Sequence, residues 1–202
     1  GDELNAFEVL TVAAYYAGER DHSIRYARHR VKLADDTGRA LDKITALRHL
    51  ATSLGVVGQR VEARRHLNQA LKLARDAGYR VEEALLVKAL GDQLYVSGAY
   101  DEAIVRFQEA AKLSAQMGQQ ADRADALKYL GECYLARGEY DRAVDHIQAA
   151  LEQFDRSGQL ANIIAARCYL ANALIAKGQV EEAERVLRAA AEQLPEDGLA
   201  NA

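Results

Sequence analysis

The apolar residues of the chain recur at steps of three and four within segments of similar length. Between Gly78 and Gly98, one set of small and apolar residues follows these steps: Ala84, Val87, Leu90, Gly91 and Leu94. The next segment carries Ala103, Ile104, Phe107, Ala110 and Ala111 at similar spacing. Such steps place the apolar side chains on one face of a helix. Strand-like alternation is absent throughout, so the pattern predicts an all-α chain.

Glycines divide the chain into equal segments. One series is Gly18, Gly58, Gly98, Gly138 and Gly178, and the other is Gly38, Gly78, Gly118, Gly158 and Gly198. Glycine favours the left-handed conformation that ends many helices, so each segment is predicted to be one helix of about 16 or 17 residues. Acidic residues begin the second helix of each pair, where they complement the helix dipole: Asp21, Glu62, Asp101, Asp141 and Glu181. We expect ten antiparallel helices joined by short turns.

Small residues recur at fixed positions of the repeat. One column lies inside the first helix of each pair and holds Thr11, Ala51, Gly91, Gly131 and Ala171. A second holds Ala63, Ala103, Ala143 and Ala183, and a third holds Ala70, Ala110, Ala150 and Ala190. Glycine inside a helix costs about 1 kcal/mol relative to alanine, so these columns predict close approach of neighbouring helices. The first unit departs from this pattern, with Ser23 and Arg30 in the two alanine columns.

The order of residues in each unit resembles the tetratricopeptide repeat. The fourth unit matches at Leu130, Gly131, Tyr134, Gly138, Tyr140, Ala143, Ile147 and Ala150, and Pro195 occupies the position of the closing proline. The resemblance implies an all-α fold, a right-handed α-α superhelix of five helix pairs. We expect one array over residues 1–202, with units of about 1–38, 39–78, 79–118, 119–158 and 159–202. The long repeat resembles the type found in bacterial signalling and regulatory proteins.

The resemblance also implies a concave groove, lined by the first helix of each pair, that binds a partner. The predicted groove residues are Arg48, Thr52, Lys88, Asp92, Tyr95, Lys128, Glu132 and Asn172. In one interpretation, Arg48, Lys88 and Lys128 form a basic ladder for an acidic peptide. In the other, Lys88–Asp92 and Lys128–Glu132 are pairs four residues apart that neutralise each other, each worth about 0.2–0.5 kcal/mol.

The leading hypothesis is a non-enzymatic scaffold that binds a protein or peptide. The alternative is a sensor or oligomerisation segment of a bacterial transcription or signalling regulator. The sequence has no phosphate-binding glycine loop, and its five histidines lack the spacing of metal ligands. We therefore expect no catalytic residues, no metal site and no cofactor.

The net charge of −4 hides an uneven distribution. Residues 18–80 carry 14 basic and 7 acidic residues, whereas residues 81–202 carry 12 basic and 20 acidic residues. The basic second helices of the first two units could suit nucleic acid, but no aromatic platform accompanies them, so a solvated surface is favoured. The sequence contains neither an apolar run long enough for a membrane span nor a signal segment. With two cysteines, these features predict a cytoplasmic protein that does not bind membranes.

Two further expectations concern single elements. Cys133 lies in a small column and is expected to be buried, whereas Cys168 lies in the groove column and is expected to be more exposed, so no disulfide should join them. The last helix carries apolar residues on more than one face: Val186, Leu187, Ala189, Ala190, Ala191 and Leu194. We expect either that the chain is a segment of a longer array or that this helix mediates self-association.

Overall fold

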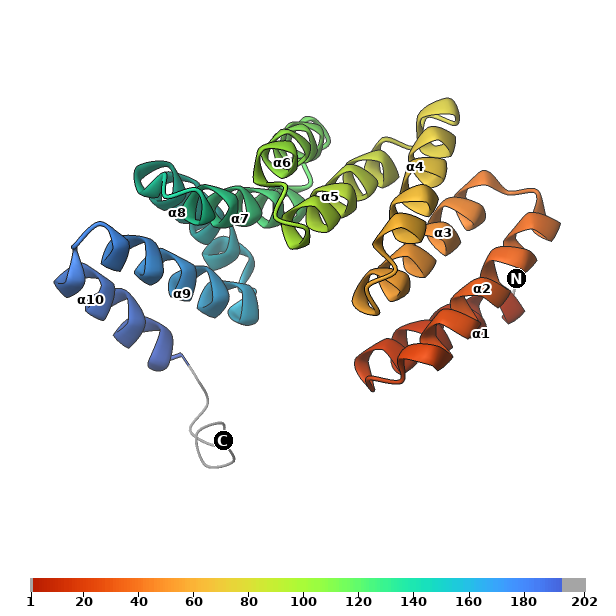
Figure 1. The fold of residues 1–202 in the computed structure, drawn as a ribbon, viewed down its shortest axis with the longest axis horizontal. Helices are drawn as coiled ribbons and strands as arrows, with labels where there is room; N and C mark the ends of the chain where they lie inside the picture. Colours follow the sequence, from red (N-terminus) through yellow and green to blue (C-terminus); the bar gives the residue numbers. More distant parts are fainter. Residues whose placement is uncertain (1, 194–202) are drawn as a thin grey trace. The chain divides into compact units, whose positions relative to one another are not determined.

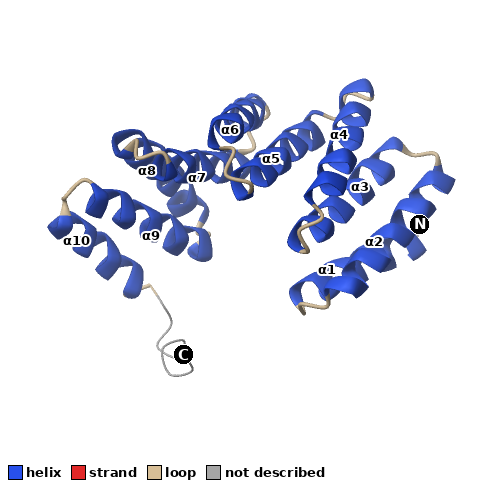
Figure 2. Ribbon diagram, in the orientation of Figure 1, coloured by secondary structure: helices blue, strands red, loops and turns tan. Residues whose placement is uncertain are grey.

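The structure, a computed structural model, describes residues 2–193 and contains ten α-helices and no strand within them (Figures 1 and 2). The helices are α1 (Asp2–Tyr16), α2 (Arg20–Thr37), α3 (Ala40–Val56), α4 (Arg60–Asp76), α5 (Arg80–Val96), α6 (Tyr100–Gln116), α7 (Gln120–Ala136), α8 (Tyr140–Ser157), α9 (Leu160–Ala176) and α10 (Val180–Ala191). We call the odd-numbered helices first helices and the even-numbered ones second helices. The predicted all-α fold of helix pairs is confirmed.

The chain divides into two compact units, residues 1–93 and 94–202. In the first unit, α2 packs against both α1 and α3, α3 packs against α4, and α1 also touches α3. In the second unit, α7 packs against α6 and α8, α9 packs against α8 and α10, and α7 touches α9. Both α2 and α8 therefore lie against the first helices before and after them in sequence. A single array over the whole chain stays a prediction.

Glycines end the helices where the two series predicted. The nine series glycines within the described residues all have positive φ, between 66° and 80°. At Gly58, this left-handed conformation turns the chain so that the N–H of Gln59 donates to the Leu54 carbonyl at 3.0 Å. That bond satisfies one of the carbonyls that the end of α3 leaves without a helical partner. The acids predicted at the starts of the second helices also lie in their first turns.

The core alternates small and large side chains. Ala103, Ala143 and Ala150 are completely or almost completely buried, and so are Phe107 and Ile147 between them. Alanine columns allow the helix axes to approach, and the large residues fill the remaining space at the density typical of protein interiors. The last helix differs, because Leu187 at the equivalent large position is 40% exposed. Leu194, which we expected to extend that apolar surface, lies outside the described residues.

Gly131 is the position where the close approach is tightest. A Cβ atom built there would overlap the buried side chain of Ile147 and lie 3.1 Å from the backbone oxygen of Ala143. Both residues belong to α8, which packs directly on α7. The interior glycine is therefore explained by the second helix of its own pair.

The cysteines are placed as expected. Cys133 is buried on α7 and Cys168 is exposed on α9, and neither forms a disulfide bond. The first unit also keeps its divergent column buried, because Ser23 and Arg30 are only 1% and 2% exposed. A buried arginine in an alanine column needs polar partners.

We expect Gly131→Ala to destabilise the protein. Alanine improves helix propensity by about 1 kcal/mol, but the overlap with Ile147 should cost more, for a net loss of about 1–2 kcal/mol. Urea unfolding followed by circular dichroism measures the change. The matched control is Gly55→Ala, whose methyl group would meet only the amide end of the flexible Gln93 side chain. Stability equal to or above wild type in Gly131→Ala would contradict this account of the packing.

Candidate functional site

The eight predicted groove residues all lie on first helices, with different exposure. In the first unit, Arg48 and Thr52 are on α3, and Lys88 and Asp92 are on α5. Thr52 is exposed, whereas the other three are half-buried. In the second unit, Tyr95 is on α5, Lys128 and Glu132 are on α7, and Asn172 is on α9.

Glu132 is buried within the second unit. Glu132 is only 4% exposed, and its carboxylate accepts hydrogen bonds from the hydroxyls of Tyr95 and Tyr169. Burial, and next the negative charge of Glu132, raise the pKa of both tyrosines. The carboxylate therefore links α5, α7 and α9 through tyrosine hydroxyls. Tyr169 was not among the predicted site residues, because its position in the repeat gave no sign of this contact.

Each base of the proposed ladder lies near an acid. The Nε atom of Arg48 is 3.5 Å from Glu82, and the Nζ atom of Lys88 is 3.7 Å from Asp92. Lys128 lies 3.8 Å from Asp125 and 4.4 Å from the centre of the Tyr129 ring. Pairs of this kind contribute little to stability. They do reduce the excess positive charge that an approaching peptide would meet.

A pocket of about 240 Å³ lies between α1 and α3. Its apolar wall comes from α1, where Val12 and Tyr15 are each 38% exposed and Tyr16 is 82% exposed. Its polar wall comes from α3 and includes two of the predicted residues, Arg48 and Thr52. The tyrosine rings meet edge to face with their centres 5.4 Å apart. The structure thus joins predicted groove residues to an aromatic edge that the sequence analysis did not single out.

A buried polar network lies next to this pocket. Arg30 of α2 donates to Glu8 at 2.6 Å, to the Nδ1 atom of His49 at 3.0 Å and to Thr45 at 3.3 Å. Burial, followed by the charges of Arg48 and Arg30, lowers the pKa of His49 to about 4. His49 is therefore neutral at pH 7. The signal in the sequence was Arg30 itself, an arginine in a column of alanines.

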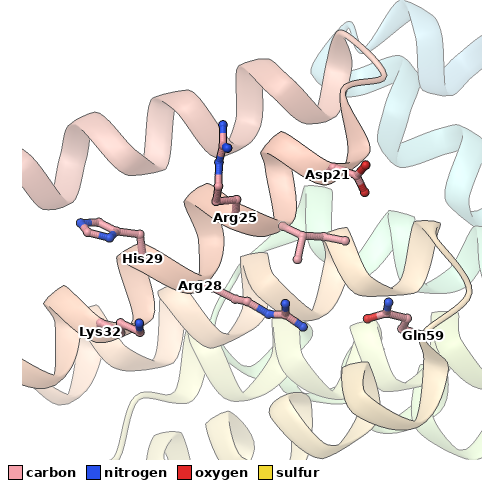
Figure 3. A pocket seen from close by; sticks show the side chains of 7 residues that line it. Asp21, Arg25, Arg28, His29, Lys32 and Gln59 are labelled. Carbon is pink, nitrogen blue, oxygen red and sulfur yellow. The ribbon is translucent and has the colours of Figure 1, made fainter.

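A second hollow, of about 530 Å³, lies along α2 and is lined by basic side chains (Figure 3). Arg25, Arg28 and His29 point in different directions from the helix, and Arg28 reaches toward Gln59. Arg28 also lies 3.3 Å from Glu62, and Asp21 is among the residues that line the hollow. Because the bases diverge and acids lie beside them, this hollow is a weaker anion site than its composition indicates.

The described residues contain neither a metal-binding cluster nor a membrane span. No group of three or more His, Cys, Asp or Glu side chains among them is arranged to hold a metal ion. None of the helices in that part of the chain is long and apolar enough to cross a membrane.

Comparisons with known proteins agree with the geometry of the helix pairs. The tetratricopeptide repeat family matches residues 122–196. BtubC (BKLC) from P. vanneervenii has the same fold, with a TM-score of 0.81, 18% identity, and coverage of 97% of this chain and 80% of that one. A comparison with curated protein sequences found no match.

Two further solved structures share the fold. A putative kinesin light chain from Podosopora anserina with nearly identical TPR-like repeats gives a TM-score of 0.76 at 18% identity, over 94% of this chain and 93% of that one. A Rap protein complexed with competence and sporulation factor gives a TM-score of 0.76 at 21% identity. The match covers 96% of this chain but only 59% of the Rap protein.

The fold and its repeated helix pairs define an α-helical repeat protein, an all-α solenoid. Residues 122–196 match the tetratricopeptide repeat family, and the fold of the chain is similar to that of a solved protein with TPR-like repeats. The predicted resemblance is confirmed. The assignment to the long-repeat type of bacterial signalling proteins stays a prediction.

We expect the imidazole of His49 to titrate near pH 4 in the folded protein, measured by NMR. The unfolded chain binds this proton from about pH 6.5 downward. Between these values the unfolded state holds more protons, so the free energy of unfolding should fall as the pH drops, by at most about 3 kcal/mol. His49→Asn, which keeps an acceptor for Arg30 but does not titrate, should lose this contribution. Titration of His49 near pH 6.5 would contradict the buried network.

Proposed function

We propose that the protein is a non-enzymatic interaction scaffold that binds a partner peptide or protein along its first helices. The observation that carries the proposal is the repeated register of partly exposed polar residues on successive first helices. Positions forty residues apart supply Arg48, Lys88 and Lys128, followed one turn later by Thr52, Asp92 and Asn172, whereas Glu132 at the same register is buried. A periodic surface of this kind suits an extended chain, which presents side chains at regular intervals.

The charge pairs within this surface indicate which pattern of charges a partner should carry. Since Arg48, Lys88 and Lys128 each lie near an acid, the surface alternates positive and negative groups. A partner with mixed polarity, rather than a uniformly acidic one, suits most of its length. Complementary charges of this kind determine specificity and association rate more than affinity.

The alternative role is a sensor or oligomerisation segment of a bacterial regulator. The fold similarity to the Rap protein complexed with competence and sporulation factor supports this role. The present chain corresponds to 59% of that protein's length, as a segment of a larger regulator would. Self-association through α10 also belongs to the proposal, supported by the 40% exposure of Leu187. We further infer a cytoplasmic location, because two cysteines that form no disulfide bond fit a reducing compartment.

Selection of a random peptide library displayed on phage against the whole chain tests the scaffold role. We expect selected peptides to bind, and Thr52→Trp or Asn172→Trp to weaken at least one class of them about tenfold or more, equivalent to about 1.4 kcal/mol. Calorimetry of synthetic peptides gives the affinities. Both residues are exposed on first helices, so the indole ring should block the surface without disturbing the core.

The matched control is Asn68→Trp, at an exposed asparagine on the second helix α4. Its peptide affinities should equal those of the wild type. The proposed surface is wrong if Asn68→Trp weakens binding as much as the first-helix variants, or if neither first-helix variant has an effect.

A further inference from the structure

The pocket between α1 and α3 differs from the rest of the first-helix surface because it combines an apolar wall with unused hydrogen-bond donors. Val12, Tyr15 and Tyr16 remain exposed on its α1 side. Its volume of about 240 Å³ is below the range of small-molecule sites and suits one side chain of a bound peptide. Exposed tyrosines beside a hollow are typical anchors of protein interfaces.

The first unused donor belongs to His49. An arginine can only donate, so the 3.0 Å contact from Arg30 requires the Nδ1 atom of His49 to accept. The neutral ring then carries its proton on Nε2. No hydrogen bond from this Nε2–H is found within the part of the chain that the structure describes, and His49 lines the pocket. One donor is therefore left for a ligand.

The second set of donors belongs to Arg48, which also lines the pocket. Its Nε atom is buried and lies 3.5 Å from Glu82, but neither atom has a hydrogen-bond partner within the described part of the chain. The side chain is 26% exposed, so its other N–H groups are accessible. An arginine fork held in this way can bind a carboxylate through two parallel bonds.

The electrostatic environment agrees with the donors. After burial, the two guanidinium groups of Arg48 and Arg30 are what disfavour protonation of His49. The same positive potential favours an anion. Of the nearby acids, Glu8 pairs with Arg30, and Glu82 lies 3.5 Å from the Nε atom of Arg48.

We infer that this pocket binds the carboxylate side chain of an acidic residue in a partner peptide, with an adjacent apolar side chain packed on Val12, Tyr15 and Tyr16. The carboxylate accepts from Arg48 and from the Nε2–H of His49. Arg30 is a positioning residue, because its hydrogen bond to the Nδ1 atom fixes the tautomer of His49. The inference rests on the proposed function and assigns the first unit of the chain a preference for Glu or Asp beside a large apolar residue.

The test uses two synthetic peptides that differ in one residue, a Glu–Leu pair and a Gln–Leu pair in the same glycine–serine background, with the whole chain. We expect the Glu peptide to bind about tenfold tighter or more, as charge-assisted hydrogen bonds require. It should also shift the NMR signals of the His49 imidazole and the Tyr15 ring. Equal affinity of the two peptides, or binding without these shifts, would overturn the inference.

Arg48→Gln should reduce the preference for the Glu peptide to about threefold or less, because one fork of donors is lost. Arg48→Lys keeps the charge and should retain part of the preference, which guards against an effect of misfolding. The matched control is Arg65→Gln, the same change at an exposed arginine of α4, and it should keep the full preference. Equal loss in Arg48→Gln and Arg65→Gln would mean general charge attraction and would refute the pocket.

The two proposals fail in different ways. If library peptides bind and Asn172→Trp weakens them while His49 and Tyr15 do not respond, the scaffold role survives and the pocket is wrong. If no peptide of any composition binds, the scaffold role itself is wrong.

Discussion

Close approach of neighbouring helices is the constraint on which the rest of the structure depends. Ile147 lies over Gly131 and beside the buried Ala143 and Ala150, so the pair α7 and α8 interlocks through one large and several small side chains. The glycines at the helix ends keep each helix short enough for the next pair to repeat the arrangement. Small residues bury little area, at about 25 cal/mol per Å². Stability must therefore come from many such contacts along the chain.

The first unit shows the effect of relaxing this constraint. Arg30 occupies an alanine position, yet it is buried: its Nη atoms donate to Glu8, His49 and Thr45, whereas its Nε atom has no hydrogen-bond partner among the described residues. Replacing a buried ion pair by apolar residues is often neutral or stabilising. We therefore expect Arg30 to stabilise the fold little more than an apolar residue at this position would. Its contact with His49 fixes the tautomer of that ring and so links Arg30 to the neighbouring pocket.

Paired charges distinguish this surface from a simple basic groove. Lys88 lies near Asp92, Lys128 near Asp125, and the carboxylate of Glu132 is held by two tyrosines. For the partner that we propose, this surface is therefore a set of separate sites, and the pocket beside Arg48 is one of them. Selectivity along such a surface depends on local geometry rather than on the net charge of −4.

The sequence alone determined the helices, their ends and the columns that pack, because these depend on a repeat of forty residues and on the properties of glycine and alanine. It also predicted the different burial of Cys133 and Cys168. Only the tertiary structure decided which polar residues remain available. Periodicity assigns a residue to a helix face, but Glu132 is buried because Tyr95 and Tyr169 reach it from neighbouring helices. Likewise, the donor of His49 depends on Arg30, nineteen residues earlier in the chain, and such a contact between helices leaves no regular pattern in the sequence.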